Sequence, residues 1–347
     1  MLTTRLVILV VTYLLIAVQQ VPLLRLNRPA AALLGAVAMV TVGGLPLHDA
    51  YAAVDLDVMV FLLGVLLMAG FLEAGGFFEW AARRIVVRAH SPRALLAAVV
   101  GVSGLLSAFF VNDTICLVLT PLMLAVLRPL RLKPLPFLLA IALSSNVGSA
   151  MTPTGNPQNM IIGVASGIHF ARFIAMLAIP SLGGLVIVFV VLSWLHRRDL
   201  AVELPSDAEI PDAPFDRSLV VRSLVVFCGA LVCWLAGLSL PLVAITAAAI
   251  LIAIAQRDPS EAFAKVEWSL LLFFGALFIV MRGARDLPLI VSLTGAAAAQ
   301  LHVRPFTTPS SRRRRWSRCR TSCRMCRRSF CGCPSSRTLQ RRHSSGS

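Results

Sequence analysis

Charged residues are scarce in this 347-residue sequence: only 14% are Asp, Glu, Lys or Arg, whereas soluble domains carry about 25%. Hydrophobic residues make up 58%, and the mean hydropathy is +0.83. This composition excludes a soluble globular enzyme. Apolar runs of about 20 residues recur as far as residue 301, so we predict an all-α polytopic protein with the lipid bilayer as its surroundings.

Acidic residues are absent from residues 304–347, which hold 13 of the 32 Lys and Arg residues and five of the eight cysteines. These arginines account for most of the net charge of +16, and the rest of the chain carries only +3. The other cysteines, Cys116, Cys228 and Cys233, lie inside apolar runs, where a thiol packs as a small apolar group. The charge therefore does not indicate a nucleic-acid partner.

Two of the apolar runs do not fit a single membrane helix. Residues 94–127 are too many for one span of about 20 residues and few for two spans with a turn. Residues 134–165 contain Thr152-Pro153-Thr154-Gly155-Asn156-Pro157, which cannot continue a helix. The remaining candidate spans are approximately residues 5–24, 30–47, 56–79, 173–195, 219–236, 239–256 and 268–285.

Basic residues flank the run 94–127 on both sides. By the positive-inside rule, both flanks are cytoplasmic, so the run predicts a re-entrant hairpin with Asn112-Asp113-Thr114 at its tip. Non-helical backbone at membrane depth must be satisfied by protein or by a water-filled cavity. We therefore expect the tip and the break at 152–157 to line a cavity. The flanking residues are Arg83, Arg84, Arg88 and Arg93 before the run and Arg128, Arg131 and Lys133 after it.

A weak internal repeat relates VDLDVMVFLLGVLL, from Val54, to VEWSLLLFFGALFI, from Val266. Counting crossings places these segments on opposite sides of the membrane, which predicts the inverted-topology repeat of many secondary transporters. We divide a transporter domain, residues 1–303, into a first repeat of about residues 50–195, a connector of about 196–222 and an incomplete second repeat of about 266–303.

Hydroxyl and amide side chains gather at the hairpin tip and the broken helix. Their oxygens suit a Na⁺-like cation, and the positive N-terminus of a resuming half-helix suits an anion. Asp113 could ligate a cation, carry a coupling proton or only cap the half-helix, and the break could be a plain kink. The candidate substrate- and ion-binding residues are Asn112, Asp113, Thr114, Ser145, Asn146, Thr152, Thr154, Gly155, Asn156, Pro157 and Asn159, with Na⁺ at Asn112, Asp113 and Asn156.

The sequence resembles the ion transporter superfamily at these two motifs, SAFFVNDTICLVLTPLMLAVL and SSNVGSAMTPTGNPQNMIIG. That superfamily includes citrate-transporter-like proteins, divalent anion/sodium symporters, arsenite permeases and NhaD-type antiporters. The resemblance covers about residues 50–300 and is nearest to the anion-transporter-like branch. It implies a secondary transporter in the cell inner membrane that moves citrate, a dicarboxylate or an inorganic oxyanion. Coupling would be to Na⁺ or H⁺ by symport or antiport, with no cofactor or structural metal, and a homodimer would be in keeping with relatives.

Two other functions are weighed against anion transport. A Na⁺/H⁺ antiporter of the same fold would use Asp113 as its exchanging carboxylate. A membrane-embedded enzyme is disfavoured, because no second membrane Asp is available to Asp113 and no HExxH motif occurs.

The resemblance stops near residue 303. We interpret residues 304–347 as disordered and translated out of frame, because the neighbouring frame permits SNLVSNVPAVLL, a second hairpin tip, across residues 319–331. A native basic tail that binds RNA, anionic lipid or zinc is the alternative, although its cysteine spacing fits no standard zinc pattern. An out-of-frame tail would leave one half-site and an inactive chain, and the predicted function would then be that of the complete transporter.

Overall fold

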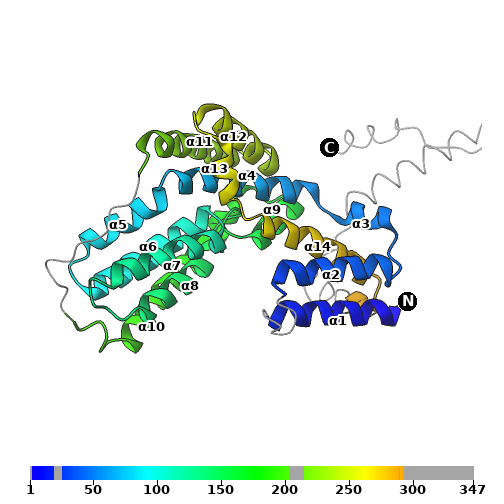
Figure 1. The fold of residues 1–347 in the computed structure, drawn as a ribbon, viewed down its shortest axis with the longest axis horizontal. Helices are drawn as coiled ribbons and strands as arrows, with labels where there is room; N and C mark the ends of the chain where they lie inside the picture. Colours follow the sequence, from blue (N-terminus) through cyan, green and yellow to red (C-terminus); the bar gives the residue numbers. More distant parts are fainter. Residues whose placement is uncertain (1, 19–25, 203–214, 289, 293–347) are drawn as a thin grey trace, which may run out of the picture. The chain divides into compact units, whose positions relative to one another are not determined.

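The computed structural model of the chain describes residues 2–18, 26–202, 215–288 and 290–292. In these residues the regular structure is α-helical without a β-strand, which confirms the all-α prediction. Residues 1–285 form one compact unit (Figure 1). The tail at 304–347, and with it the predicted change of frame, lies outside the described residues.

Fourteen helices are defined in the described part of this unit. They are α1 (Leu2–Val18), α2 (Arg28–Thr41), α3 (Leu47–Ala53), α4 (Leu56–Ala74), α5 (Phe77–Arg88), α6 (Pro92–Phe109), α7 (Asn112–Leu127), α8 (Leu135–Ser149), α9 (Pro157–Ser166), α10 (Phe170–Leu195), α11 (Arg217–Leu235), α12 (Leu240–Ile254), α13 (Pro259–Lys265) and α14 (Trp268–Ala284).

Four of these helices, α4, α6, α10 and α11, are long and apolar enough to cross a membrane. Helices α13 and α14 pass the same test together, as one span bent by 55°. Five shorter helices, α1, α2, α7, α8 and α12, are also apolar. By length and composition, the described residues are therefore those of a polytopic membrane protein.

The long run 94–127 folds as two helices in contact, α6 and α7, as predicted. The chain turns at Phe110 and Val111, which are buried and extended, so Asn112-Asp113-Thr114 forms the first turn of α7 and not the turn itself. The apolar side chains at the turn are buried, whereas the polar side chains of Asn112 and Thr114 form hydrogen bonds with Asn146 and Glu267 on other elements. The re-entrant path through the membrane stays a prediction.

The second unusual run is a broken helix, also as predicted. Helix α8 ends at Ser149 and α9 begins at Pro157. Proline suits this first helical position because its missing N–H would have no partner there. The Oδ1 atom of Asn156, the N-cap residue, accepts a hydrogen bond of 2.8 Å from the backbone N–H of Asn159.

Helices α6, α7, α8 and α10 lie against one another on one side of the unit (Figure 1). The closest approach joins α6 to α8 at Gly104 and Gly148, where a Cβ atom added to Gly148 would overlap the Gly104 backbone. Nearby, the Ser103 and Ser144 hydroxyls share a buried hydrogen bond between the same helices. This packing fixes the C-terminal end of α8 relative to the hairpin.

Eight of the other helices repeat one order: α1–α4 and α11–α14 each contain two helices, a seven-residue helix and a long helix. Val54 and Val266, aligned in the sequence repeat, each end the short helix in extended conformation. The long helices are exchanged between the sets, since α4 contacts α12 and α13 while α14 contacts α2 and α3. The sequence repeat thus matches a repeated helix order, and its inverted orientation in the membrane stays a prediction.

Candidate functional site

A cavity of about 730 Å³ lies where the N-terminal ends of α2, α7, α9 and α14 meet. Each helix N-terminus carries a partial positive charge, so these four favour negative groups, whereas the C-terminal ends of α1 and α8, which also reach the lining, carry partial negative charge. The lining residues are Ile16, Ala17, Arg28, Pro29, Asn112, Asp113, Asn146, Ser149, Asn156, Pro157, Gln158, Asn159, Glu267, Ser269, Leu270, Phe273 and Phe274. We call this cavity the central cavity.

Six of the eleven predicted site residues line the central cavity. They are Asn112, Asp113, Asn146, Asn156, Pro157 and Asn159. The hairpin tip and the end of the break therefore line one cavity, whereas residues 152–155 do not line it.

The start of α7 is tied to the broken helix by Asn112. Its backbone N–H donates to the carbonyl of Gly155 at 3.0 Å, and its side-chain Nδ2 donates to Oδ1 of Asn146 at 3.2 Å. Asn146 in turn donates to the carbonyl of Ala142 at 2.8 Å. Next to this network, Asp113 is exposed to the cavity.

Asn156 and Asn159, at the start of α9, donate hydrogen bonds to carbonyl groups at the end of α8 and in the break. The Nδ2 atom of Asn159 lies 3.2, 3.1 and 2.9 Å from the carbonyl oxygens of Ser149, Ala150 and Thr152. The Nδ2 atom of Asn156 reaches the carbonyl of Ser149 at 3.3 Å. These side-chain donors satisfy helix-end carbonyls, so any ligand role falls to the Oδ1 atom of Asn159 and to open backbone N–H groups.

Three predicted residues of the break pack outside the cavity lining. Thr152 and Thr154 are fully buried, and both hydroxyls donate to the carbonyl of Ala108 at the end of α6. A Cβ atom on Gly155 would overlap the backbone of Ser149, so only glycine allows this close approach. These residues hold the break against the hairpin and do not line the cavity.

The last two predicted residues also lie outside the cavity lining. Thr114 is buried, and its hydroxyl donates to Oε1 of Glu267 at 3.4 Å. The buried hydroxyl of Ser145 pairs with the thiol of Cys116 at 2.9 Å. Ligand roles for all eleven residues remain predictions.

Sequence reasoning missed two charged residues of the cavity, Arg28 and Glu267. Arg28 begins α2 and interacts electrostatically with Asp113. Glu267 stands at the N-terminus of α14, in the bend between α13 and α14. The repeat held a signal for Glu267, because this residue aligns with Asp55, the side-chain N-cap of α4. Nothing in the sequence near Arg28 marked it.

The arrangement can bind an anion and a cation in one space. Arg28, the Gln158 amide and the helix N-termini supply hydrogen-bond donors and positive potential. Asp113, Glu267 and side-chain oxygens supply acceptors for Na⁺ or a proton. Among the described residues, no group of three or more His, Cys, Asp and Glu side chains could hold a metal ion.

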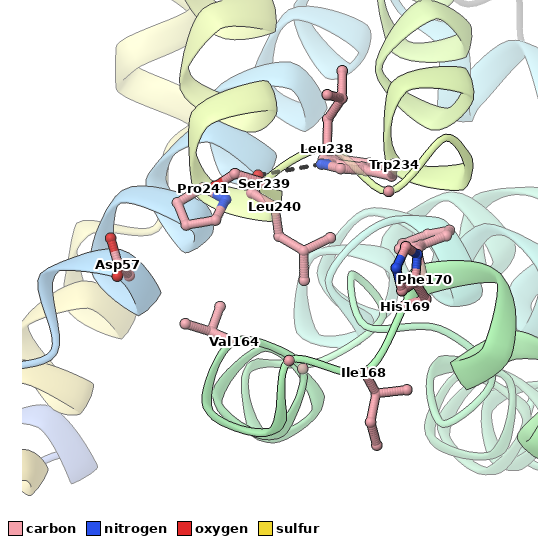
Figure 2. Close-up of a pocket in the computed structure, with 13 residues that line it drawn as sticks. Asp57, Val164, Ile168, His169, Phe170, Trp234, Leu238, Ser239, Leu240 and Pro241 are labelled. Atoms are coloured by element: carbon pink, nitrogen blue, oxygen red, sulfur yellow. Dashed lines mark hydrogen bonds between the residues drawn. The ribbon is translucent and has the colours of Figure 1, made fainter. Parts of the chain in front are cut away.

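A second, smaller cavity of about 260 Å³ lies between the α9–α10 loop, the α11–α12 loop and the start of α4 (Figure 2). Its lining is polar and apolar in about equal parts, with Asp57 and His169 as the charged or titratable side chains, both exposed. Trp234 Nε1 donates to the carbonyl of Leu240 at 3.2 Å and closes one wall. The starts of α4, α10 and α12 border this cavity, but it is smaller than the central cavity and has no Arg or Lys in its lining, so it is a weaker candidate for an anion site.

The sequence matches the CitMHS citrate transporter family over residues 13–308. The chain belongs to this family. Its members are transporters and not enzymes, so the chain is a multi-pass membrane protein of a transporter family. The match ends five residues after residue 303, where the resemblance to the superfamily was expected to stop.

Several relatives support this assignment. The silicon efflux transporter LSI3 of Oryza sativa subsp. japonica is 31% identical over 332 residues, covering 79% of this chain and 68% of LSI3. An uncharacterized transporter of Mycobacterium tuberculosis (strain ATCC 25618 / H37Rv), Rv2684, is 33% identical over 311 residues, covering 85% and 70%. The inner membrane protein YbiR of Escherichia coli (strain K12) is 30% identical over 249 residues, covering 70% and 63%.

Proposed function

We propose that this chain carries the anion- and cation-binding half-site of a secondary transporter that moves a small carboxylate or oxyanion. The observation that carries the proposal is the central cavity, where Arg28 and four helix N-termini meet two carboxylates. An anion would lie between Arg28 and the starts of α7 and α9, since donors and positive potential converge there. Transport by the complete protein would couple this anion to Na⁺ or H⁺.

Two relatives give this proposal its context. LSI3 is named a silicon efflux transporter, which favours an inorganic substrate. YbiR is named an inner membrane protein, and we propose the same location for this chain. Citrate, a dicarboxylate and an inorganic oxyanion all fit a cavity of about 730 Å³.

A Na⁺/H⁺ antiporter is the second candidate, and the carboxylates of Asp113 and Glu267 in one cavity favour it. A cationic side chain attracts an anion and repels Na⁺. Arg28 in the same lining therefore favours the anion transporter.

The test is equilibrium binding to the purified chain in lipid nanodiscs, with labelled citrate, labelled sulfate and labelled Na⁺ as probes. Anion binding predicts saturable binding of citrate or sulfate, with an affinity that falls at least about tenfold in Arg28→Gln, which corresponds to about 1.4 kcal/mol. Arg222→Gln is the matched control, because Arg222 bonds to the carbonyl of Ile254 and lies outside the cavity lining. Saturable Na⁺ binding without anion binding would instead support the antiporter.

A further inference from the structure

The turn between α7 and α8 holds an arginine in a strained backbone conformation. The N–H of Leu132 donates to the carbonyl of Leu127 at 3.2 Å, and the N–H of Arg131 donates to the carbonyl of Arg128 at 3.1 Å. This pair of bonds is a common helix C-terminal motif, and it places Arg131 in the left-handed region with φ of 53°. Glycine or asparagine usually occupies that position, because other side chains are strained there. The strain indicates that the arginine side chain has a use that the turn alone does not explain.

Further cations lie beside this turn. Arg128 belongs to the turn, and Arg197-Arg198 follow the end of α10. These three side chains and that of Arg131 are exposed. The end of α10 is held against the turn, because Nζ of Lys133 lies 2.6 Å from Oδ1 of Asp199. We call Arg128, Arg131 and Arg197-Arg198 the turn surface.

Asp199, the acidic residue that directly follows Arg198, is already engaged. Lys133 pairs with one of its carboxylate oxygens, and Nδ1 of His196 lies 3.3 Å from the other. Within the described residues, the guanidinium groups of the turn surface have no hydrogen bond or ion pair. They are therefore open to a negatively charged partner.

Apolar side chains border the turn surface. Trp194 and Leu195, at the end of α10, are 70% and 61% exposed, and Leu135, at the start of α8, is 56% exposed. Only 11% of the apolar window of α10 is buried inside the chain. The exposed side chains thus change from apolar to cationic within one helix turn. The same change of polarity occurs between the acyl chains and the headgroups of a membrane.

We propose that the turn surface binds the headgroup phosphate of an anionic phospholipid, whose acyl chains lie against Trp194 and Leu195. The positive-inside rule assigns this end of the helices to the cytoplasmic side, where anionic lipids attract basic segments. Arginine suits a phosphate because its guanidinium can donate two parallel hydrogen bonds. The bound lipid would hold the end of α7 and the start of α8 at the membrane surface.

The connector after α10 is the other partner that these charges could attract. Residues 203–214 contain four acidic residues and no Lys or Arg, and they lie outside the described residues. The turn surface favours a lipid, because its cations adjoin exposed apolar side chains, as a phosphate adjoins acyl chains in one phospholipid. Occupation by the connector is an outcome of the test.

The experiment titrates the purified chain in detergent with phosphatidylglycerol and, separately, with phosphatidylcholine. Native mass spectrometry measures the dissociation constant of the first bound lipid. The wild type should bind phosphatidylglycerol several-fold more tightly, because this lipid has a net negative charge and phosphatidylcholine has none. Arg131→Gly should weaken phosphatidylglycerol binding about fivefold, the effect expected when one charge near the headgroups is lost, and leave phosphatidylcholine binding unchanged.

The stability of the same variant separates lipid binding from damage to the fold. Arg131→Gly should unfold at or above the wild-type midpoint, since glycine relieves the left-handed strain. Arg131→Asn, which is neutral and also tolerates this conformation, should repeat both results. Arg131→Lys keeps the charge and should retain the preference for phosphatidylglycerol. Arg172→Gln is the matched control, because it removes the same charge near the start of α10, at the other end of that helix.

Four results would overturn the proposal. The first is equal affinity of the wild type for both lipids, or phosphatidylglycerol binding that is unchanged in Arg131→Gly. The second is an equal loss in Arg172→Gln, since the preference would then be spread over the chain. The third is displacement of the lipid by inorganic phosphate at constant ionic strength, which would indicate a site for free anions. The fourth is a preference that appears only when the four acidic residues of the connector are replaced by their amides, because the connector would then occupy the surface.

Discussion

Replacing Gly148 by alanine should weaken the packing of α6 against α8, on which the site depends. The added Cβ atom would overlap the carbonyl oxygen, Cα and carbonyl carbon of Gly104. All three are backbone atoms, so no side chain can rotate away and the helices must separate. Overpacking of this kind costs about 1–3 kcal/mol, of which the better helix propensity of alanine returns at most about 1 kcal/mol.

The net expectation is a loss of up to about 2 kcal/mol in the free energy of unfolding. It would be measured from thermal or denaturant unfolding of the purified chain in detergent. Gly101→Ala in α6 and Gly183→Ala in α10 are matched controls, because a Cβ atom at either position has no neighbour within 4 Å. A Gly148→Ala variant that unfolds at or above the wild-type midpoint would refute the close approach of the two helices.

Three further substitutions test the hydrogen bonds around the broken helix and at the start of α11. Asn159→Ala should lower the free energy of unfolding by about 1–3 kcal/mol, because three carbonyl oxygens lose a common donor, and denaturant titration checks this. Thr152→Val keeps the shape but removes a buried hydroxyl donor, so a loss of similar size is expected in the same assay. Hydrogen bonds from the Leu219 N–H and the Arg257 guanidinium hold the pKa of Asp216 below its ordinary value. That stabilisation is complete above about pH 4 and is lost as the pH falls through the lowered pKa, so Asp216→Asn should flatten the acid limb of a stability–pH curve.

Local sequence was enough to predict the two interruptions that build the site. Proline at 153 and 157 cannot continue α8, and the polar triplet from Asn112 cannot sit in the middle of an apolar span. The position of the hairpin turn differed by two residues, because Phe110 and Val111 are buried at the turn and the polar triplet starts the next helix. Such a difference depends on tertiary burial, which a local pattern does not contain.

The two charged cavity residues that lie outside the hairpin and the broken helix, Arg28 and Glu267, could not be predicted in the same way. Arg28 and Glu267 come from helix starts that are far from the hairpin in sequence and reach it through the packing of α14 on α2. Their short polar stretches look like ordinary helix ends. The roles of Thr152 and Thr154 were also hidden, because burial against Ala108 distinguishes a support from a ligand and appears only in the fold.

Protection of a single cysteine in each cavity tests most directly where the anion binds. In a chain whose eight native cysteines are replaced, Gln158→Cys places a thiol in the central cavity and Ser239→Cys places one in the smaller cavity. The rate of reaction with a charged thiol reagent is then measured with and without saturating citrate or sulfate. Our account predicts that the anion slows the reaction several-fold at residue 158 and leaves it unchanged at residue 239. Protection at residue 239 alone, or at neither position, would contradict the central cavity as the anion site.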